Sequence, residues 1–501
     1  MLAASSAKSH LRSDAGPLIA AAAVLVLLMA VSGRYGYHRD ALYFLAAGHH
    51  LAWGYPDQPP FTPVLARTMS SIAPGSLPVL VLPSAIASAV DVLLTARLAR
   101  ELGASRGAQT LAAVAMATAP FLLGSGHLLS TATFGLFFWT VVLYLVVRIL
   151  RTGNDRLFVV VGIVAGLGLL DSDLLAFLLV GLAVGVLISG PRDIFRSRWL
   201  WVGVVIAVVM WTPYLVWQGQ NGWPELTVSR SIAAGGSGSS TPRWALIPFQ
   251  FFLANVWLAP VWIVGLWRLI RSGELRWARA VGWCWVFLVV VLTVSGGKAY
   301  YLTGMLPVLL AAGAQPSLDW ARRKPRRLTG WMIGAGIATL VALPITLPLV
   351  PLAQLHKSGV VKANYDAGEQ VAWPTYVDEI MAVYRQHSSR VDATGVEGGE
   401  VVLASNYGEA GAVERYAHVT AYSGDMGFWW WGPPPMQRST LVIAVGFDQQ
   451  SLQRWFGSVT LATRLDNHLG VNNDEQGASV RVCARMRADW STIWPRLKTL
   501  G

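Results

Sequence analysis

The stretch TFGLFFWTVVLYLVVRIL, residues 133–150, contains one charged residue, Arg148, close to its end. A helix of about 20 apolar residues crosses the hydrocarbon core of a bilayer. Runs of this kind recur on both sides of it in the 501-residue chain, which is 54% hydrophobic and only 13% charged, with a mean hydropathy of +0.47. In ordinary soluble domains about 25% of residues are charged. The sequence therefore predicts a polytopic α-helical membrane protein.

Eleven apolar runs are candidate membrane spans. They cover residues 17–33, 77–96, 108–124, 132–150, 157–170, 173–189, 199–217, 244–267, 280–296, 302–316 and 331–352. The first run is not followed by a small-residue cleavage pattern, so we expect a retained helix rather than a signal peptide. The two cysteines, Cys284 and Cys483, do not indicate an internal disulfide framework.

Basic residues gather in the short connections between alternate runs. The clusters lie in residues 97–106, 148–156, 192–198, 268–279 and 322–327. Cytoplasmic loops of membrane proteins carry an excess of Lys and Arg. We therefore expect these loops, and the N-terminus with Lys8 and Arg12, to face the cytoplasm. The net charge of +12 belongs to this pattern and is not a sign of nucleic-acid binding.

The C-terminal part has a different composition. Residues 1–352 contain 26 basic and 12 acidic residues, a net charge of +14, whereas residues 353–501 contain 13 and 15, a net charge of −2. The tail combines strand-like stretches, EVVLAS and STLVIAV, with the helix-like WPTYVDEIMAVYRQ, which is typical of a small soluble α/β domain. An odd number of spans places this tail on the outer face. We thus expect a transmembrane domain (1–352), with a long first external loop (34–76), and an extracytoplasmic α/β domain (353–501).

A cluster of charged side chains follows the first span. The stretch YGYHRDALYF, residues 35–44, contains Asp40, and its charged or titratable neighbours are Arg34, His38, Arg39, His49, His50 and Asp57. A carboxylate here could act as a general base on an acceptor, and an arginine could hold a phosphate by charge-assisted hydrogen bonds. The alternative is an interfacial anchor, because Tyr, Trp and Arg collect at headgroup depth.

A second external cluster is GGKAYYL, residues 296–302. Lys298 follows two glycines, which permit close backbone approach, and precedes two tyrosines. A lysine in this place suits a lipid-linked phosphate. The alternative is a lysine that snorkels to the interface within an aromatic belt.

Two acids lie at the tip of an apolar hairpin in LLDSDLLAF, residues 169–177. Asp171 and Asp173 could bind a cation or an acceptor, but such acids more often cap a helix and keep a turn in water. The stretch QGQNGWP (218–224) could bind a sugar or form an ordinary turn. AAGGSGSSTP (233–242) is typical of a mobile external loop. FWWWGPPP (428–435) could stack on a sugar, and packing against the helices is the favoured alternative. His127 is expected in a solvated loop.

Taken in order, several stretches resemble the glycosyltransferase 39-like family, which includes dolichyl-phosphate-mannose–protein mannosyltransferases and aminoarabinose transferases. The stretches are HRDALYFLAAGHHLAWGYPDQPPFTPVLAR, TFGLFFWTVVLYLVVRIL, PYLVWQGQNGWP, GGKAYYLTGMLPVLLAAGA, SNYGEAGAVERY and WWWGPPP, spread from about residue 35 to about residue 435. The resemblance implies a membrane-embedded, C-type glycosyltransferase fold in the bacterial cytoplasmic (inner) membrane.

The resemblance also implies a reaction and a set of residues. A sugar would pass from a polyprenyl-phosphate donor to a protein, lipid or glycan acceptor on the outer face, with Asp40 as the base. Lys298 would hold the donor phosphate, with help from Arg34 or Arg39. Further substrate contacts are expected from residues of the same stretches: His38, Tyr43, Asp57, Gln58, Tyr300 and Tyr301. No cofactor is expected with certainty, and a divalent metal ion near Asp171 and Asp173 stays open.

The sequence departs from the family pattern at several positions. Relatives commonly have a second acid where this chain has Ala41, an Asp where it has Gly135, and a Lys where it has Ser172. They also often have His and Asn near residues 424–428. These losses leave a degenerate relative, which binds lipid-linked sugar or a partner without turnover, as the main alternative to an enzyme. A transporter of lipid-linked sugar is a third, which would need charged or broken helices at mid-bilayer.

Overall fold

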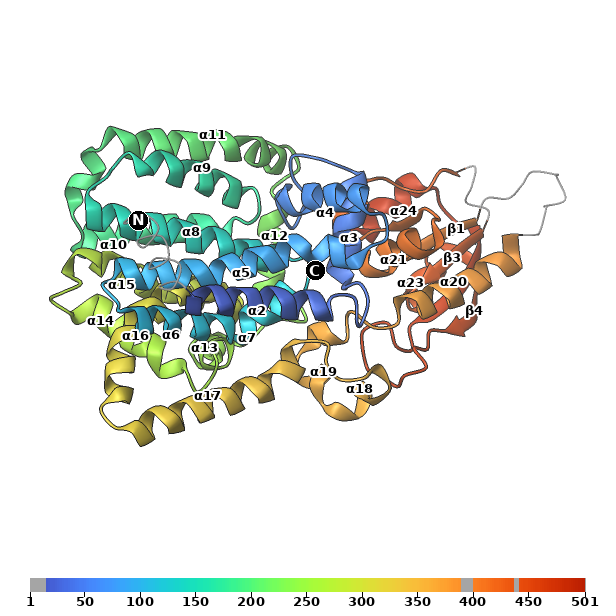
Figure 1. Cartoon of the computed structure of the whole chain (residues 1–501). Coiled ribbons are helices and arrows are strands. Elements are labelled where there is room, and N and C mark those ends of the chain that lie inside the picture. Colours follow the sequence, from blue (N-terminus) through green and yellow to red (C-terminus); the bar gives the residue numbers. More distant parts are fainter. Residues whose placement is uncertain (1–14, 389–399, 437–440, 501) are drawn as a thin grey trace.

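The computed structural model describes residues 15–388, 400–436 and 441–500. An elongated bundle of helices forms one end of the molecule and a sheet flanked by helices forms the other (Figure 1). Lys8 and Arg12 lie outside the described residues.

The bundle is made of the apolar stretches of the sequence. Its helices are α2 (Ala15–Val31), α5 (Leu77–Glu101), α6 (Arg106–Ala117), α7 (Pro120–Gly126), α8 (Thr131–Thr152), α9 (Leu157–Leu169), α10 (Leu174–Ser189), η1 (Arg192–Arg196), α11 (Arg198–Gln220), α13 (Leu246–Leu253), α14 (Ala259–Arg271), η3 (Arg276–Ala278), α15 (Arg279–Ser295), η4 (Ala299–Met305), α16 (Leu306–Arg322) and α17 (Pro325–Thr346). Every predicted span falls on helix.

The predicted count of eleven spans is not confirmed. Among the described residues, five helices are long and apolar enough to cross a membrane, or six when the bent pair α6 and α7 counts as one span. The run 244–267 was predicted as one span and is two helices, α13 and α14. The chain turns between them at Asn255, which has a φ of 71°, and a proline stands in the first turn of α14. Apolar content alone does not reveal such a break.

Glycines let several helices of the bundle approach at backbone distance. A Cβ on Gly265 of α14 would collide with the carbonyl oxygen of Leu309 in α16, and one on Gly313 would collide with that of Val261. The crossing of α9 and α11 at Gly162 and Gly203 is equally close. Small residues of this kind are typical of helix interfaces in membranes, where close packing replaces the hydrophobic effect.

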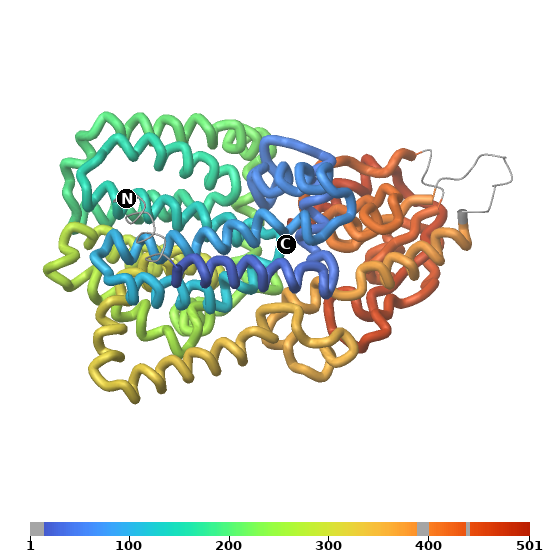
Figure 2. Tube along the Cα trace, in the orientation of Figure 1, coloured from blue at the N-terminus to red at the C-terminus, as the bar shows by residue number. Residues whose placement is uncertain are grey.

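The first external loop forms a layer between the bundle and the tail. It contains α3 (Arg39–His49) and α4 (Phe61–Ile72), and a later loop contains α12 (Pro224–Ala233) and η2 (Arg243–Ala245). Figure 2 shows that the blue segment after α2 leaves the bundle, lies against the orange and red part of the chain, and returns into α5. Residues near 40 are thereby brought beside residues near 400.

The tail has the α/β character expected from its sequence. Its elements are α18 (Leu352–Ser358), α19 (Val360–Ala363), η5 (Tyr365–Ala367), α20 (Trp373–Ser388), β1 (Glu400–Ala404), α21 (Tyr407–Ala417), β2 (Ala421–Ser423), α22 (Gly427–Trp430), β3 (Leu441–Val445), α23 (Gln449–Gln453), β4 (Phe456–Arg464), β5 (Ser479–Met486) and α24 (Trp490–Leu497). The predicted strand stretches became β1 and β3, and the predicted helix became α20.

The five strands form one mixed sheet in the order β2–β1–β3–β5–β4. β1 is parallel to β2 and β3, with Val402 opposite Ile443, and β5 is antiparallel to β3 and β4. α20 and α21 pack on one side of this sheet, and α21 also packs on α3. The tail therefore touches the first external loop through a helix.

Candidate active site

Asp40 stands in the first turn of α3, at the junction of bundle and tail. Its side chain is 42% exposed. His38 is the N-cap residue of α3, and its Nδ1 accepts a hydrogen bond from the Asp40 backbone N–H at 3.1 Å. The cap fixes the start of the helix. Asp40 Oδ1 accepts a hydrogen bond of 2.7 Å from the Tyr407 hydroxyl, which belongs to the tail.

Lys298 lies beside Tyr300 and under the Gly/Ser-rich loop. Its Nζ donates a hydrogen bond of 2.8 Å to Ser239 Oγ and lies 5.8 Å from the centre of the Tyr300 ring. Burial, and next the negative charges of Asp366 and Asp40, raise the pKa of Tyr300, so its hydroxyl keeps its proton. Lys298 thus lies beside Tyr300, and the Tyr300 hydroxyl is also influenced by the charges of Asp366 and Asp40, which are distant in the sequence.

Asp366 links these groups and was not recognised in the sequence. Its Oδ1 lies 3.6 Å from His38 Nε2. Burial alone would raise the pKa of Asp366, but His38 and then Lys298 outweigh it and hold that pKa below its usual value. Burial alone would lower the pKa of His38, and Asp366 with Asp40 raises it overall. The predicted substrate residue His38 is therefore buried between two carboxylates.

Arg39 is paired with the tail. Its Nη1 contacts Glu369 Oε2 at 2.9 Å and Asp474 Oδ2 at 3.0 Å, and donates to the Tyr365 hydroxyl at 3.0 Å. The Glu369 side chain is fully buried. All three contacts are made by Nη1, so this nitrogen of Arg39 pairs with the tail, and the phosphate role of Arg39 stays a prediction. Arg34 is exposed at the end of α2, and no contact described in the structure brings it to Asp40.

Asp57 and Tyr43 form a second polar pair near Asp40. The Tyr43 hydroxyl donates to Asp57 Oδ1 at 2.8 Å and accepts from the Gly427 backbone N–H of the tail. Burial, and also the charges of Asp40 and Asp425, raise the pKa of Asp57 to about 7. Tyr43 is buried, so it supports Asp57 rather than facing solvent. Gln58, predicted as a substrate contact, is also buried, and Tyr301 is half-buried behind Lys298.

The sequence favoured Asp171 and Asp173 as helix caps exposed to water. The structure shows instead that both carboxylates accept hydrogen bonds from neighbouring elements. Asp171 is buried and accepts a hydrogen bond of 2.9 Å from Thr62 of α4. Asp173 holds the N-cap position of α10 but makes no capping bond. It accepts instead from Trp211 at 3.2 Å and from Tyr214 at 3.1 Å. The two acids thus connect the hairpin tip to α4 and α11 by hydrogen bonds.

Asp173 belongs to an acidic group with Glu225 of α12. The Tyr214 hydroxyl lies within hydrogen-bond distance of both carboxylates. Burial, and next the charge of Asp173, raise the pKa of Glu225. No group of three or more His, Cys, Asp or Glu side chains able to hold a metal ion occurs in the described part of the chain. Within those residues, Asp171 and Asp173 therefore lack a third ligand of the His, Cys, Asp or Glu type.

Two tryptophans of 428–435, Trp430 and Trp431, pack against the bundle side, in line with the favoured interpretation, whereas Trp429 packs against Trp494 within the tail. Trp430 donates to Asn221 Oδ1 at 2.9 Å, and its ring lies 6.1 Å from that of Trp217. Trp431 stacks on His50 at 4.4 Å. The predicted turn at 218–224 thus docks the tail.

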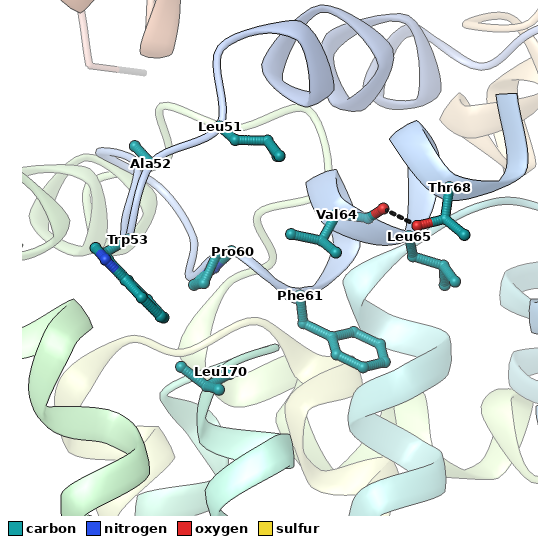
Figure 3. A pocket seen from close by; sticks show the side chains of 9 residues that line it. All are labelled: Leu51, Ala52, Trp53, Pro60, Phe61, Val64, Leu65, Thr68 and Leu170. Carbon is teal, nitrogen blue, oxygen red and sulfur yellow. Dashed lines mark hydrogen bonds between the residues drawn. The ribbon is translucent and has the colours of Figure 1, made fainter. Parts of the chain in front are cut away.

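An apolar groove of about 470 Å³ opens beside the first external loop (Figure 3). One wall is the loop, the second is the start of α4, and Leu170 at the hairpin tip closes it. The lining residues are Leu51, Ala52, Trp53, Pro60, Phe61, Val64, Leu65, Thr68 and Leu170. The same loop carries Asp57, so apolar and acidic surfaces adjoin.

Four residues near Asp40 or His38 were not among the predicted site residues: Asp366, Tyr407, Asp425 and His127. His127 was expected in a solvated loop, but it is buried and lines a water-sized cavity together with His38. Tyr407 lies in the stretch SNYGEAGAVERY, whose capping-box pattern predicts a helix start at that residue. For Asp366, a lone acid in a loop, the sequence gives no local signal.

Comparisons with known proteins agree with this architecture. Residues 57–217 match the family described as dolichyl-phosphate-mannose-protein mannosyltransferase. The structure is similar to that of ArnT from Cupriavidus metallidurans in the apo state, with a TM-score of 0.62 and 14% identity over 96% of this chain and 98% of that one. ArnT bound to undecaprenyl phosphate gives 0.62 and 15%, over 93% and 97%. No curated protein sequence matches the chain.

A weaker structural similarity is to the Archaeoglobus fulgidus oligosaccharyltransferase tethered with an acceptor peptide. It has a TM-score of 0.46 and 16% identity, over 81% of this chain and 63% of that one. The family match and the fold shared with ArnT confirm the resemblance to the glycosyltransferase 39-like family predicted from the sequence.

Proposed function

We propose that this chain is a membrane glycosyltransferase that moves a sugar from a polyprenyl-phosphate donor to an acceptor on the outer face of the membrane. The observation that carries the proposal is the chain of charged groups from Asp40 to Lys298. Asp40 Oδ2 lies 3.8 Å from His38 Nδ1, and Asp366 Oδ1 lies 3.6 Å from His38 Nε2. Lys298 is close enough to Asp366 for its charge to lower the pKa of that carboxyl. The ArnT fold and the match of residues 57–217 support the reaction class.

Asp40 is suited to act as the general base. In the reaction, the acceptor oxygen or nitrogen forms a bond to the anomeric carbon of the sugar, and the bond from that carbon to the phosphate oxygen breaks. The acceptor proton passes to Asp40, whose carboxylate is partly exposed and therefore accessible. General-base catalysis contributes about 10²- to 10⁴-fold in rate.

Lys298 is suited to stabilise the leaving polyprenyl phosphate. Its ammonium now binds Ser239, a neutral hydroxyl that a phosphate oxygen can replace. Fixed positive charge at the leaving group stabilises the charge that develops in the transition state. With Arg39 paired to the tail, Lys298 is the cation that we assign to the phosphate.

The groove of Figure 3 supports a substrate with a hydrocarbon chain. Its walls are almost entirely aliphatic and aromatic, and they adjoin the loop that carries Asp57. One relative with this fold is described as bound to undecaprenyl phosphate. A polyprenyl chain in the groove would keep the sugar near the acidic surface.

Two positions where relatives carry acids, Ala41 and Gly135 of this chain, are relevant to the alternative of a non-catalytic relative. A side chain at Gly135 would begin 4.0 Å from Asp171 Oδ2, so Asp171 occupies the neighbourhood in which relatives often carry an acid. Ala41 is buried, and the first turn of α3 contains Asp40 but no second acid.

The test is sugar transfer by purified protein in liposomes that contain radiolabelled lipid-linked sugars extracted from host membranes. We expect Asp40→Asn to lower transfer at least 100-fold, whereas Asp378→Asn, an exposed acid on α20, leaves it unchanged. Equal transfer by wild type and Asp40→Asn would remove Asp40 from the chemistry. Donor binding without transfer by either protein would favour the non-catalytic alternative.

A further inference from the structure

Two helices that are distant in the sequence meet at the candidate base. α21 of the tail lies along α3 of the first external loop (Figure 1). Glycines of α21 make the approach close, because a Cβ on Gly411 would lie 3.0 Å from the Leu42 carbonyl group and one on Gly408 would lie 3.3 Å from Arg39 Cβ. The distance between the helices is therefore set by backbone contact, which leaves little freedom to slide.

Tyr407, the first residue of α21, is held on several sides. A capping box formed by Asn406 and Glu409 fixes the start of the helix. The Tyr407 backbone N–H donates to Asp425 Oδ2 at 3.2 Å. Its ring lies 5.0 Å from the Tyr43 ring and 4.8 Å from the Arg39 guanidinium carbon. The hydroxyl thus has a defined position before any substrate binds.

The Tyr407 hydroxyl uses one of the two Asp40 oxygens and leaves the other accessible. It donates to Oδ1 at 2.7 Å, while the contact described for Oδ2 among the described residues is with His38 Nδ1, at 3.8 Å. Burial, and next the charge of Asp40, raise the pKa of Tyr407, so the hydroxyl stays a donor. The other titratable groups around this pair are Arg39 and Asp425, which contact Tyr407, and Asp57, whose pKa is raised in part by the charge of Asp40.

We propose that Tyr407 is a positioning residue that anchors Oδ1 of the base Asp40 and turns Oδ2 toward the acceptor, so that the tail completes the active site. This inference rests on the proposed function. A hydrogen bond to the ionised form of a carboxylate stabilises that form. Loss of the hydroxyl should therefore make Asp40 take up a proton at higher pH and should loosen its orientation.

The experiment compares wild type, Tyr407→Phe and the matched control Tyr365→Phe. Tyr365 lies in the same junction and contacts Arg39 and Asp474, with no hydrogen bond to Asp40 among the contacts described. One readout is the pH profile of kcat/KM in the liposome assay. The second is the pH dependence of carbodiimide labelling of Asp40, measured by mass spectrometry of the purified protein, which needs no turnover.

In Tyr407→Phe we expect the midpoint of labelling and the acidic limb of kcat/KM to move to higher pH than in wild type, because the ionised carboxylate loses a hydrogen bond. We also expect kcat to fall about tenfold with little change in the acceptor KM, whereas Tyr365→Phe should follow wild type in both readouts. Equal midpoints in all three proteins would overturn the inference. A shifted midpoint in a protein whose wild type transfers no sugar would overturn the proposed function and leave the hold of Tyr407 on Asp40 supported.

Discussion

Asp57 is a residue of the candidate site whose protonation changes near neutral pH. Burial and the charges of Asp40 and Asp425 raise its pKa from 3.8 to about 7, although Tyr43 donates a hydrogen bond to it. The folded protein therefore takes up a proton here at a pH at which the unfolded chain does not. Stability from this group is fully present below about pH 4 and is lost as the pH rises through about 7.

Asp57→Asn should remove this loss. A shift of about three pH units sets a ceiling of about 4 kcal/mol, and since the side chain is partly exposed we expect about 1–2 kcal/mol. The variant should melt at a higher temperature than wild type at pH 8 and at nearly the same temperature at pH 4, as measured by thermal unfolding in detergent. Asp489→Asn, an exposed acid of the tail, is the control. A melting difference that does not depend on pH would contradict the assignment.

Among the elements, those with a local pattern were predictable and those with a distant cause were not. The apolar run 133–150 predicts α8, and the stretches EVVLAS and STLVIAV predict β1 and β3. The break between α13 and α14 depends on a turn at Asn255 within an apolar run, which has no periodic signal. Likewise, Asp40 and Lys298 could be selected from their sequence context, but their neighbours Asp366 and Tyr407 are set by tertiary contacts.

The close packing of α21 on α3 can be tested by a substitution at Gly411. Gly411→Ala places a methyl group 3.0 Å from the Leu42 backbone, so the helices must separate. We expect a loss of about 1–3 kcal/mol in unfolding free energy, together with weaker sugar transfer because Tyr407 moves away from Asp40. The control is Gly330→Ala in α17, where an added Cβ meets nothing within 4 Å. Unchanged melting and transfer in Gly411→Ala would show that the junction yields easily.

For the molecule as a whole, Arg39 is the main charged connection between bundle side and tail. It pairs with Glu369 and Asp474, and the fully buried Glu369 has no other cation among the ion pairs described. Breaking a buried pair leaves an uncompensated charge and is strongly destabilising. The sequence assigned Arg39 to a phosphate because the tail partners are more than 300 residues away.

Arg39→Ala should therefore lower the unfolding free energy by about 3–5 kcal/mol and should speed proteolysis between the bundle and the tail. Thermal unfolding and limited proteolysis with mapped cleavage sites measure the two effects. Arg196→Ala is the matched control, because Arg196 pairs with Asp193 at the surface and such pairs contribute about 0–1 kcal/mol. Equal melting of the two variants would show that the Arg39 pairs do not hold the tail in place.

The contact between Tyr407 and Asp40 also forms late in the synthesis of the protein. The ribosome makes Asp40 among the first residues and Tyr407 only after about four fifths of the chain. This hydrogen bond can therefore form only after the tail has been made and has folded onto α3. A chain that ends before residue 407 would keep Asp40 but would lack its hydrogen-bond donor from the tail.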